Sequence, residues 1–354
     1  LFNSRGESAA RIGSNKEITE IKQVLGLEIG GKYTPESVKT KLRYGKVLFM
    51  TDQDLDGSHI KGLGLNLFDS EWGSLLEIPD FIGFMNTPII KATKGIKTVS
   101  FYNEGEYEQW KEKSPENKLW KIKYFKGLGT STAKEFKEYF ANKKIVMFSH
   151  NENDENDENS LDMVFNKKRA PDRKQWLGTY DRAAYLDTNK PEISIKEFID
   201  REMKHFSKYD NDRSIANCVD GLKVSLRKIL FSAFRKKLFN EIKVAQFSGY
   251  VSEHSGYHHG EASLNGAIVG LAQQFVGSNN INLFEPNGQF GSRLRGGKDS
   301  ASERYIFTKL SKLTRLIYPE ADDAILHYLS DDGQNVEPIY YVPIIPMILV
   351  NGCK

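Results

Sequence analysis

The segment LFMTDQDLDGSH at residues 48–59 places three aspartates at alternate positions directly after an apolar run. In an extended segment alternate side chains point to the same face, so Asp52, Asp54 and Asp56 would lie side by side. Gly57 follows at once and suits a tight turn after a strand. Crowded carboxylates are favourable only around a cation, so the spacing indicates a candidate metal site. A solvated acidic turn is the alternative.

Strand-like and helix-like stretches alternate around this acidic segment. Residues 44–50 and 81–93 are predicted to contain strands, and residues 59–76 and 131–143 to form helices. Such alternation predicts an α/β layer structure over residues 1–150. Open α/β sheets place their functional sites at the carboxyl ends of strands, which is where the aspartates occur.

The composition changes abruptly after this region. Residues 151–162 read NENDENDENSLD, which is acidic, polar and free of aromatic side chains, and basic residues follow. This composition is typical of a flexible linker. We therefore expect an acidic and then basic linker over residues 151–175 that separates two domains.

Beyond the expected linker the pattern becomes helical. Residues 195–210, 222–239 and 261–277 carry apolar side chains at helical spacing, and short strand-like pieces with glycine-rich turns follow them. Helices followed by short strands and basic loops fit a winged-helix arrangement, which binds duplex DNA. The chain is thus predicted to be multidomain, with an α/β domain followed by an α+β domain.

Two stretches of the second half are strongly basic, although the formal net charge is only +3. Residues 223–243 hold seven basic residues and one acidic residue, and residues 292–312 hold six and two. Aromatic residues interrupt both stretches, which favours surfaces that bind polyanions. Solvated helix faces are the alternative for each stretch.

Membrane insertion and cysteine chemistry receive no support from the sequence. The longest apolar run, at residues 342–350, contains two prolines and is too short to span a bilayer. The two cysteines, Cys218 and Cys353, have no spacing that suggests zinc or a disulfide framework. A reducing intracellular compartment is the expectation.

Several longer motifs resemble a known family. In chain order they are MTDQDLDGSHIKGL, KYFKGLGTSTAKEFKEYF, DGLKVSLRKILFSAF, SGYHHGEASL, FVGSNNINLFEPNGQFGSRLRGGKDSASERYIFTKL and YYVPIIPMILVNG. Together they resemble the DNA-binding and cleavage core of eukaryotic-type type II DNA topoisomerases. The resemblance implies a toprim metal-binding domain over residues 1–150, a winged-helix domain over 176–322 and the start of a tower domain over 323–354. It also implies that the chain is part of a longer enzyme.

By this resemblance Tyr305 is the nucleophile of transient double-strand cleavage, with a 5′-phosphotyrosyl link and a free 3′ hydroxyl as products. A free phenol has a pKa near ~10, so attack at neutral pH needs a cationic neighbourhood. Arg304 is adjacent, and Arg293, Arg295 and Lys298 precede it. Because neighbouring side chains on a strand point apart, Arg304 can act with Tyr305 only if this segment is irregular. The alternative is a tyrosine of the apolar core.

The same resemblance implies roles for other residues. Asp52 and Asp54 would bind Mg²⁺, one or two ions per site, with Asp56 in support. His259 would assist catalysis as a neutral imidazole that donates to phosphate. Lys126 would steady the metal domain or contact phosphate. The residues implied in DNA binding are Lys167, Lys168, Arg169, Lys223, Arg227, Tyr257, His258, Arg293 and Lys298.

Some family features differ or are absent here. Glu7 and Ala10 follow Arg5 and Gly6, where the family carries a DNA-contacting lysine and asparagine. The family's metal-site glutamate and its ATPase domain have no counterpart in these residues, so ATP would be used only through a domain absent from this chain.

The resemblance further implies duplex DNA as substrate, a homodimer with its active site assembled in trans, no membrane association, and a location in the nucleus or at a viral replication site. Two alternatives stay open. One is a toprim-type metal-dependent nuclease in which water attacks the phosphate, and the other is a non-catalytic DNA-binding module.

Overall fold

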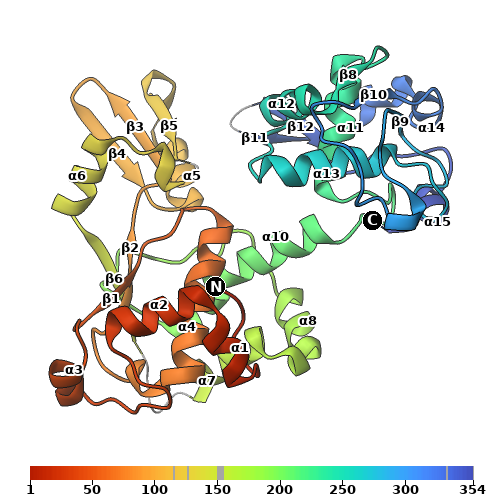
Figure 1. The fold of residues 1–354 in the computed structure, drawn as a ribbon. Coiled ribbons are helices and arrows are strands. Elements are labelled where there is room, and N and C mark those ends of the chain that lie inside the picture. Colours follow the sequence, from red (N-terminus) through yellow and green to blue (C-terminus); the bar gives the residue numbers. More distant parts are fainter. Residues whose placement is uncertain (115, 126, 150–154, 332–333, 354) are drawn as a thin grey trace. The chain divides into compact units, whose positions relative to one another are not determined.

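A computed structural model describes residues 1–114, 116–125, 127–149, 155–331 and 334–353 of the chain. It divides into two compact units, Leu1–Tyr209 and Asp210–Lys354 (Figure 1). Lys126 and residues 151–154 of the acidic stretch lie outside the described residues. Each unit has its own apolar core.

A four-stranded mixed sheet lies at the centre of the first unit, in the order β1-β2-β6-β7. Strand β1 (Val47–Phe49) runs parallel to β2 (Ile82–Asn86). Strand β6 (Lys144–Ser149) pairs antiparallel with β2 and parallel with β7 (Glu192–Ser194). The predicted strands at residues 44–50 and 81–93 are thereby confirmed.

Helix α4 (Leu55–Trp72) follows β1 and is buried along most of its length. Leu65 and Phe68 are fully buried in the same core as Phe81 and Phe84, which belong to β2 and the segment that enters it. Burial of an apolar side chain of this size contributes roughly 1.5–3 kcal/mol, so this core fixes the helix on the sheet. Further helices of this unit are α1 (Ala9–Ser14), α2 (Lys16–Leu25), α3 (Pro35–Lys41), α7 (Glu155–Phe165), α8 (Ala170–Gly178), α9 (Ile195–Phe198), the π-helical turn η5 (Ile199–Met203) and α10 (Lys204–Ser214), which extends beyond Tyr209.

A small antiparallel sheet with its own core completes the first unit. Its order is β4-β3-β5, with strands β3 (Ile90–Lys94), β4 (Lys97–Phe101) and β5 (Lys121–Tyr124). Helix α5 (Glu104–Lys113) contributes Tyr107 to this core. Helix α6 (Ala133–Ala141) begins at a capping box, which agrees with the predicted helix at residues 131–143.

Three longer helices and a three-stranded antiparallel sheet build the second unit. Sheet order is β8-β10-β9, and the helices contribute Leu230, Phe247 and Ile268 to the core. The helices are α11 (Val224–Lys236), α12 (Val244–Ser255), α13 (Glu261–Ala272) and the shorter α14 (Thr314–Ile317) and α15 (Met347–Asn351). The strands are β8 (Ile242–Lys243), β9 (Phe284–Asn287), β10 (Phe307–Leu310) and the hairpin β11 (Tyr328–Asp331) and β12 (Gln334–Pro338). None of the described helices is long and apolar enough to cross a membrane.

The expected linker at residues 151–175 does not divide the units. Helix α7 begins within the acidic stretch, and Leu161 and Phe165 are buried in the core of the first unit. Strand β7 then adds a strand to the central sheet. The linker was predicted from the average composition of the stretch, which a few apolar side chains change very little. The division falls instead between Tyr209 and Asp210, within α10.

Candidate functional site

The acidic segment forms a turn and the start of a helix. Strand β1 ends at Phe49 and α4 begins at Leu55, with Asp54 as its N-cap. The Asp54 carboxylate accepts the N–H of Gly57 at 2.8 Å, an arrangement that the helix dipole also favours. The expectation that three aspartates line one face of an extended segment is therefore wrong, because the helix starts before Asp56.

Two glycines allow a second loop to close on this turn. The backbone N–H of Leu128 donates to Oδ1 of Asp52 at 2.6 Å. A β-carbon added to Gly57 would lie 2.0 Å from the carbonyl oxygen of Asp52, and one added to Gly127 would lie 2.8 Å from its Oδ1. Glycine at position 57 permits the turn itself, and glycine at position 127 lets the second loop approach Asp52, so the DLDG motif and residues 127–128 meet at Asp52.

The donor set of the turn fits a partial magnesium site. Asp52 and Asp54 are exposed, and Asp56 is half-buried in the first turn of α4. Across the part of the chain that the structure describes, no three His, Cys, Asp or Glu side chains form a group that could hold a metal ion. Mg²⁺ commonly binds one or two carboxylates together with waters and substrate phosphate. Asp52 and Asp54 suit such a site and not a closed protein cage.

Tyr305 lies on an exposed turn of the second unit. Its side chain is 71% exposed, so it is not a tyrosine of the apolar core. The N–H of Tyr305 donates to the carbonyl of Ser302 at 2.9 Å, and β10 begins only at Phe307. The Arg304 guanidinium carbon lies 5.9 Å from the centre of the Tyr305 ring. The segment is thus irregular, as joint action of Arg304 and Tyr305 requires.

A basic loop precedes Tyr305 and is held by three polar side chains, those of Gln273, Ser292 and Asp299, which no motif indicates. Ser292 donates its N–H and hydroxyl to the Asp299 carboxylate at 2.8 and 2.7 Å, and these bonds lower the pKa of Asp299. Gln273 donates to the carbonyls of Phe290 and Gly297 at 2.8 and 3.3 Å. The loop exposes the cationic side chains of Arg293, Arg295 and Lys298.

Two residues expected to bind DNA are buried. Arg227 is 4% exposed and donates to both oxygens of Asp220, from Nε at 2.7 Å and from Nη2 at 3.0 Å. Tyr257 is 8% exposed and belongs to the core of the second unit. The Arg227 guanidinium is thus engaged by Asp220 inside the second unit, and little of Tyr257 reaches the surface. Lys223 lies half-buried at the N-cap of α11.

The two histidines of the GYHHG motif are exposed. His258 Nε2 lies 3.2 Å from Oδ2 of Asp331 in β11, and the His259 ring meets the Tyr257 ring edge to face at 5.4 Å. Gly256 has φ +62, and a β-carbon there would lie 2.1 Å from the same Asp331 oxygen. The turn is thus built around a contact with the β11–β12 hairpin.

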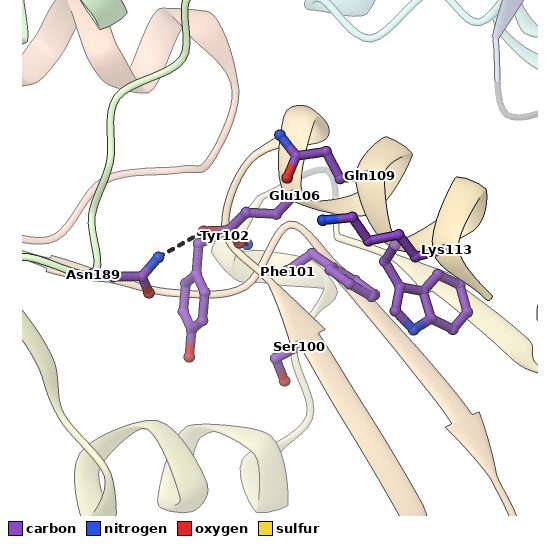
Figure 2. A pocket seen from close by; sticks show the side chains of 8 residues that line it. Ser100, Phe101, Tyr102, Glu106, Gln109, Lys113 and Asn189 are labelled. Carbon is purple, nitrogen blue, oxygen red and sulfur yellow. Dashed lines mark hydrogen bonds between the residues drawn. The ribbon is translucent and has the colours of Figure 1, made fainter.

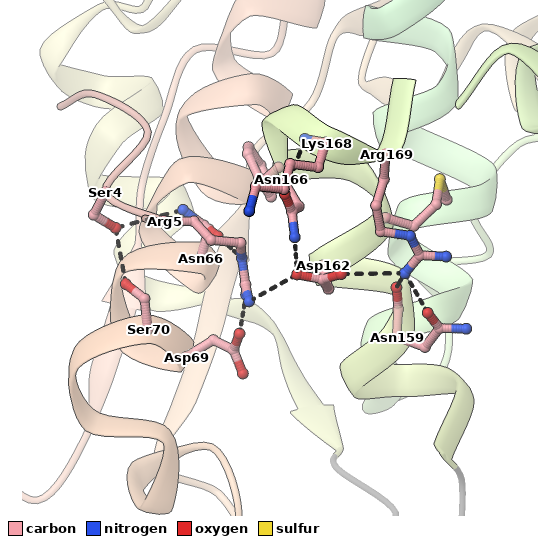
Figure 3. Close-up of polar contacts among 12 residues, drawn as sticks. Ser4, Arg5, Asn66, Asp69, Ser70, Asn159, Asp162, Asn166, Lys168 and Arg169 are labelled. Atoms are coloured by element: carbon pink, nitrogen blue, oxygen red, sulfur yellow. Dashed lines mark hydrogen bonds and ion pairs between the residues drawn. The ribbon is translucent and has the colours of Figure 1, made fainter. Parts of the chain in front are cut away.

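Two of the three basic residues that follow α7, Lys167 and Arg169, form ion pairs with acidic residues. Lys167 Nζ lies 2.6 Å from Oε1 of Glu7, and hydrogen bonding to Lys167 is the main reason that the pKa of Glu7 is lowered. Asp162 lies between Arg5 and Arg169, at 3.4 and 3.3 Å from their guanidinium nitrogens (Figure 3). Lys168 and Ala10 are exposed.

An open cleft of about 410 Å³ lies beside the small sheet of the first unit. Glu106 accepts a bond from Asn189 at 3.5 Å across it (Figure 2). None of the residues predicted to carry chemistry lines this cleft, whose walls are Ser100, Phe101, Tyr102, Glu106, Gln109, Trp110, Lys113 and Asn189.

Comparisons with known proteins agree with this division of the chain. Residues 85–211 match the family model of the C-terminal associated domain of TOPRIM. Residues 213–354 match the family model of DNA gyrase/topoisomerase IV, which describes the A subunit of those enzymes. The two matches meet close to the division between Tyr209 and Asp210.

Longer relatives match the whole chain. DNA topoisomerase 2 of Arabidopsis thaliana is 53% identical over 100% of this chain and 24% of the relative, and that of Saccharomyces cerevisiae is 50% identical over 100% and 25%. The structure of the Plasmodium falciparum topoisomerase II DNA-binding, cleavage and re-ligation domain matches with a TM-score of 0.83 and 49% identity, covering 100% of this chain and 48% of that chain. The chain belongs to the eukaryotic type II DNA topoisomerases and spans about a quarter of the length of the curated relatives it matches.

Proposed function

We propose that this chain forms the DNA breakage and reunion core of a type II topoisomerase, an enzyme that passes one duplex through another. The observation that carries the proposal is the exposure of Tyr305 beside Arg304, in the segment that follows the basic loop at residues 292–299. An exposed phenol next to an exposed guanidinium group offers a phosphate both a nucleophile and a cation that stabilises negative charge. The matched Plasmodium structure is described as a DNA-binding, cleavage and re-ligation domain, which supports the same function.

The proposed reaction is a reversible transesterification. The Tyr305 oxygen bonds to a DNA phosphorus and loses its proton, while the bond from phosphorus to the 3′ oxygen breaks and that oxygen gains a proton. Arg304 and the loop cations stabilise the negative charge that develops on the phosphate. The phosphodiester is exchanged for a phosphotyrosyl ester, so the reverse attack by the 3′ hydroxyl reseals the strand without another energy source.

Asp52 and Asp54 are the proposed Mg²⁺ ligands, with Asp56 in support. When bound, the ion supplies charge stabilisation to the phosphate and to the leaving oxygen. The role of the chain there is to present two exposed carboxylates on a turn fixed by Gly57 and by the N–H of Leu128.

The domain and partner assignments rest on the family resemblance. We assign the sheet with α4 to a toprim domain, helices α11–α13 with the β8-β10-β9 sheet to a winged-helix domain, and the last residues to the start of a tower domain. The proposed partners are duplex DNA and a second copy of the chain, whose acidic turn would serve Tyr305 of the first copy. The ATP dependence and nuclear location implied for the parent enzyme remain proposals of the same kind.

Covalent capture tests the function directly. Labelled supercoiled or nicked duplex is mixed with the protein and Mg²⁺, denatured with detergent, and examined for label attached to protein through its 5′ end. We expect attachment with the wild type, and its loss in Tyr305→Phe and in Asp54→Asn. Tyr340→Phe is the matched control, because Tyr340 is also an exposed tyrosine of the second unit and has no proposed role.

The other outcomes select the alternatives. Cut DNA without attached protein, unaffected by Tyr305→Phe, would identify a metal-dependent nuclease. Binding without cleavage would identify a DNA-binding module, an alternative consistent with the two-carboxylate donor set of the acidic turn.

A further inference from the structure

We propose that Glu202 is a positioning residue for the acidic turn, acting from the π-helical turn η5 through Ser58 and Lys61 of α4. This inference rests on the proposed function for its catalytic consequence. Its structural part, that Glu202 holds the first turn of α4 in place, stands independently.

A single carboxylate oxygen joins the two elements. Oε1 of Glu202 accepts the hydroxyl of Ser58 at 2.6 Å and also pairs with the ammonium group of Lys61. Ser58 donates its own backbone N–H to the carbonyl of Asp54 at 3.3 Å, which makes it part of the first turn that Asp54 caps. The path from Glu202 to the backbone of the N-cap residue Asp54 therefore passes through the Ser58 side chain and one backbone hydrogen bond.

The buried ammonium group of Lys61 requires the carboxylate of Glu202 as its ionic partner. The residue is 9% exposed, and its ammonium group lies 4.5 Å from the Phe84 ring centre and 5.7 Å from that of Phe198. Aromatic faces stabilise a cation only partly, and a buried charge needs an ionic partner. Glu202 supplies that partner, so its carboxylate is held at a fixed place behind the acidic turn.

The π-helical turn explains how Glu202 reaches α4. Five residues, Ile199–Met203, adopt π geometry between α9 and α10, a rare conformation that occurs frequently at functional sites. Two further contacts join the same two segments. Met203 packs closely against Gly62, where an added β-carbon would lie only 2.7 Å from Sδ of Met203. The His59 ring stacks on the Phe206 ring, with 4.1 Å between the ring centres. Successive residues of one segment thus dock on the start of α4, more contact than is needed to neutralise one lysine.

Hydrogen exchange and magnesium dependence together test the inference. In Ser58→Ala and Glu202→Gln we expect the amides of the first turn of α4, at residues 57–61, to exchange at least about tenfold faster, while those of β2 and β6 are unchanged. We also expect the Mg²⁺ concentration for half-maximal covalent capture to rise by about 10–100-fold, as with other residues that orient metal ligands. Glu197→Gln is the control, because Glu197 is on α9 and pairs with Lys190 instead of α4.

A double variant separates positioning from general stability. In Lys61→Met with Glu202→Leu the buried pair is replaced by apolar side chains, a change that is often neutral for stability. We expect the Tm of the double variant to lie close to that of the wild type. Exchange of the amides at residues 57–61 should stay fast and the magnesium requirement should stay high, because the Ser58 hydroxyl no longer has the Glu202 carboxylate as its acceptor. Normal exchange at residues 57–61 in Ser58→Ala, or recovery of both readouts in the double variant, would overturn the positioning role. A wild type that captures no DNA would count against the proposed function alone, and the exchange data would still decide the role of Glu202.

Discussion

Arg227 and Asp220 form a bidentate ion pair inside the second unit, with both side chains almost completely excluded from solvent. Asp220 also accepts the N–H groups of Leu222 and Tyr341, each at 2.9 Å. Its carboxylate thereby connects the start of α11 with the segment that follows β12. The pair connects two segments of the second unit, although the family resemblance implies that Arg227 binds DNA.

The first prediction follows from that burial. Arg227→Met leaves the Asp220 carboxylate buried without its cation, so the free energy of unfolding should fall by about 3–5 kcal/mol. Urea denaturation measures this loss, and the folded fraction should bind DNA as tightly as the wild type. Lys223→Met, at the half-buried N-cap of the same helix, serves as control and should leave stability within about 0.5 kcal/mol. A stable Arg227→Met protein with weak DNA binding would restore the original assignment.

The contrast between Arg227 and Arg293 shows what the sequence could supply. Both residues lie in basic stretches, and the motifs place both near DNA. Arg227 is buried because it pairs with the Asp220 carboxylate, seven residues earlier. Arg293 is exposed because it lies on a loop that the Asp299 carboxylate closes. Local composition does not encode such contacts, so the sequence predicted the elements and the exposed cations but not which arginine is buried.

The acidic stretch at residues 151–162 differs from the predicted linker for a related reason. Its average composition is that of a linker, yet Leu161 and Phe165, spaced for one face of a helix, bury α7 in the first core. Strands β1 and β2 and helices α4 and α11 were predictable because their apolar residues are dense. The π-helical turn was not, because the segment 195–210 has an ordinary helical pattern and the irregularity depends on contacts with α4.

Gly57→Ala is predicted to damage the acidic turn. The added methyl group would overlap the carbonyl oxygen of Asp52, which is backbone and cannot rotate away. We expect a loss of about 1–3 kcal/mol in stability and a larger loss of covalent capture at fixed Mg²⁺, because Asp52 must move. Gly45→Ala is the matched control, since nothing lies within 4 Å of its added carbon. Equal capture by the two variants would show that the geometry of the turn is not needed.

Glu135 should make the stability of α6 depend on pH. Burial alone would raise the pKa of its carboxyl, but hydrogen bonds from Lys123 and Thr132 outweigh burial and lower it to about 2. A depressed pKa means that this stabilisation is complete above the ordinary glutamate value of about 4.3 and is lost as pH falls toward about 2. Glu135→Gln should cost about 1 kcal/mol at pH 7, and the difference from wild type should shrink over that window. Denaturation at a series of pH values measures it, and a constant difference would contradict the assignment.

Glu7 is predicted to weaken DNA binding by occupying two cations. Its carboxylate pairs with Lys167 at 2.6 Å and with Arg11 at 2.7 Å, so a phosphate must displace it before it can reach either group. Glu7→Gln should therefore tighten binding by up to about tenfold at low salt and steepen the dependence of log affinity on log salt by about one or two units. Fluorescence anisotropy over a salt series measures both. Glu20→Gln is the control, because it breaks another exposed pair, with Lys16, that has no proposed DNA role. The salt dependence also tests whether DNA contacts these residues. An unchanged salt slope in Glu7→Gln would mean that neither Lys167 nor Arg11 contacts DNA. A slope change of about one unit would assign a single phosphate contact to these two residues.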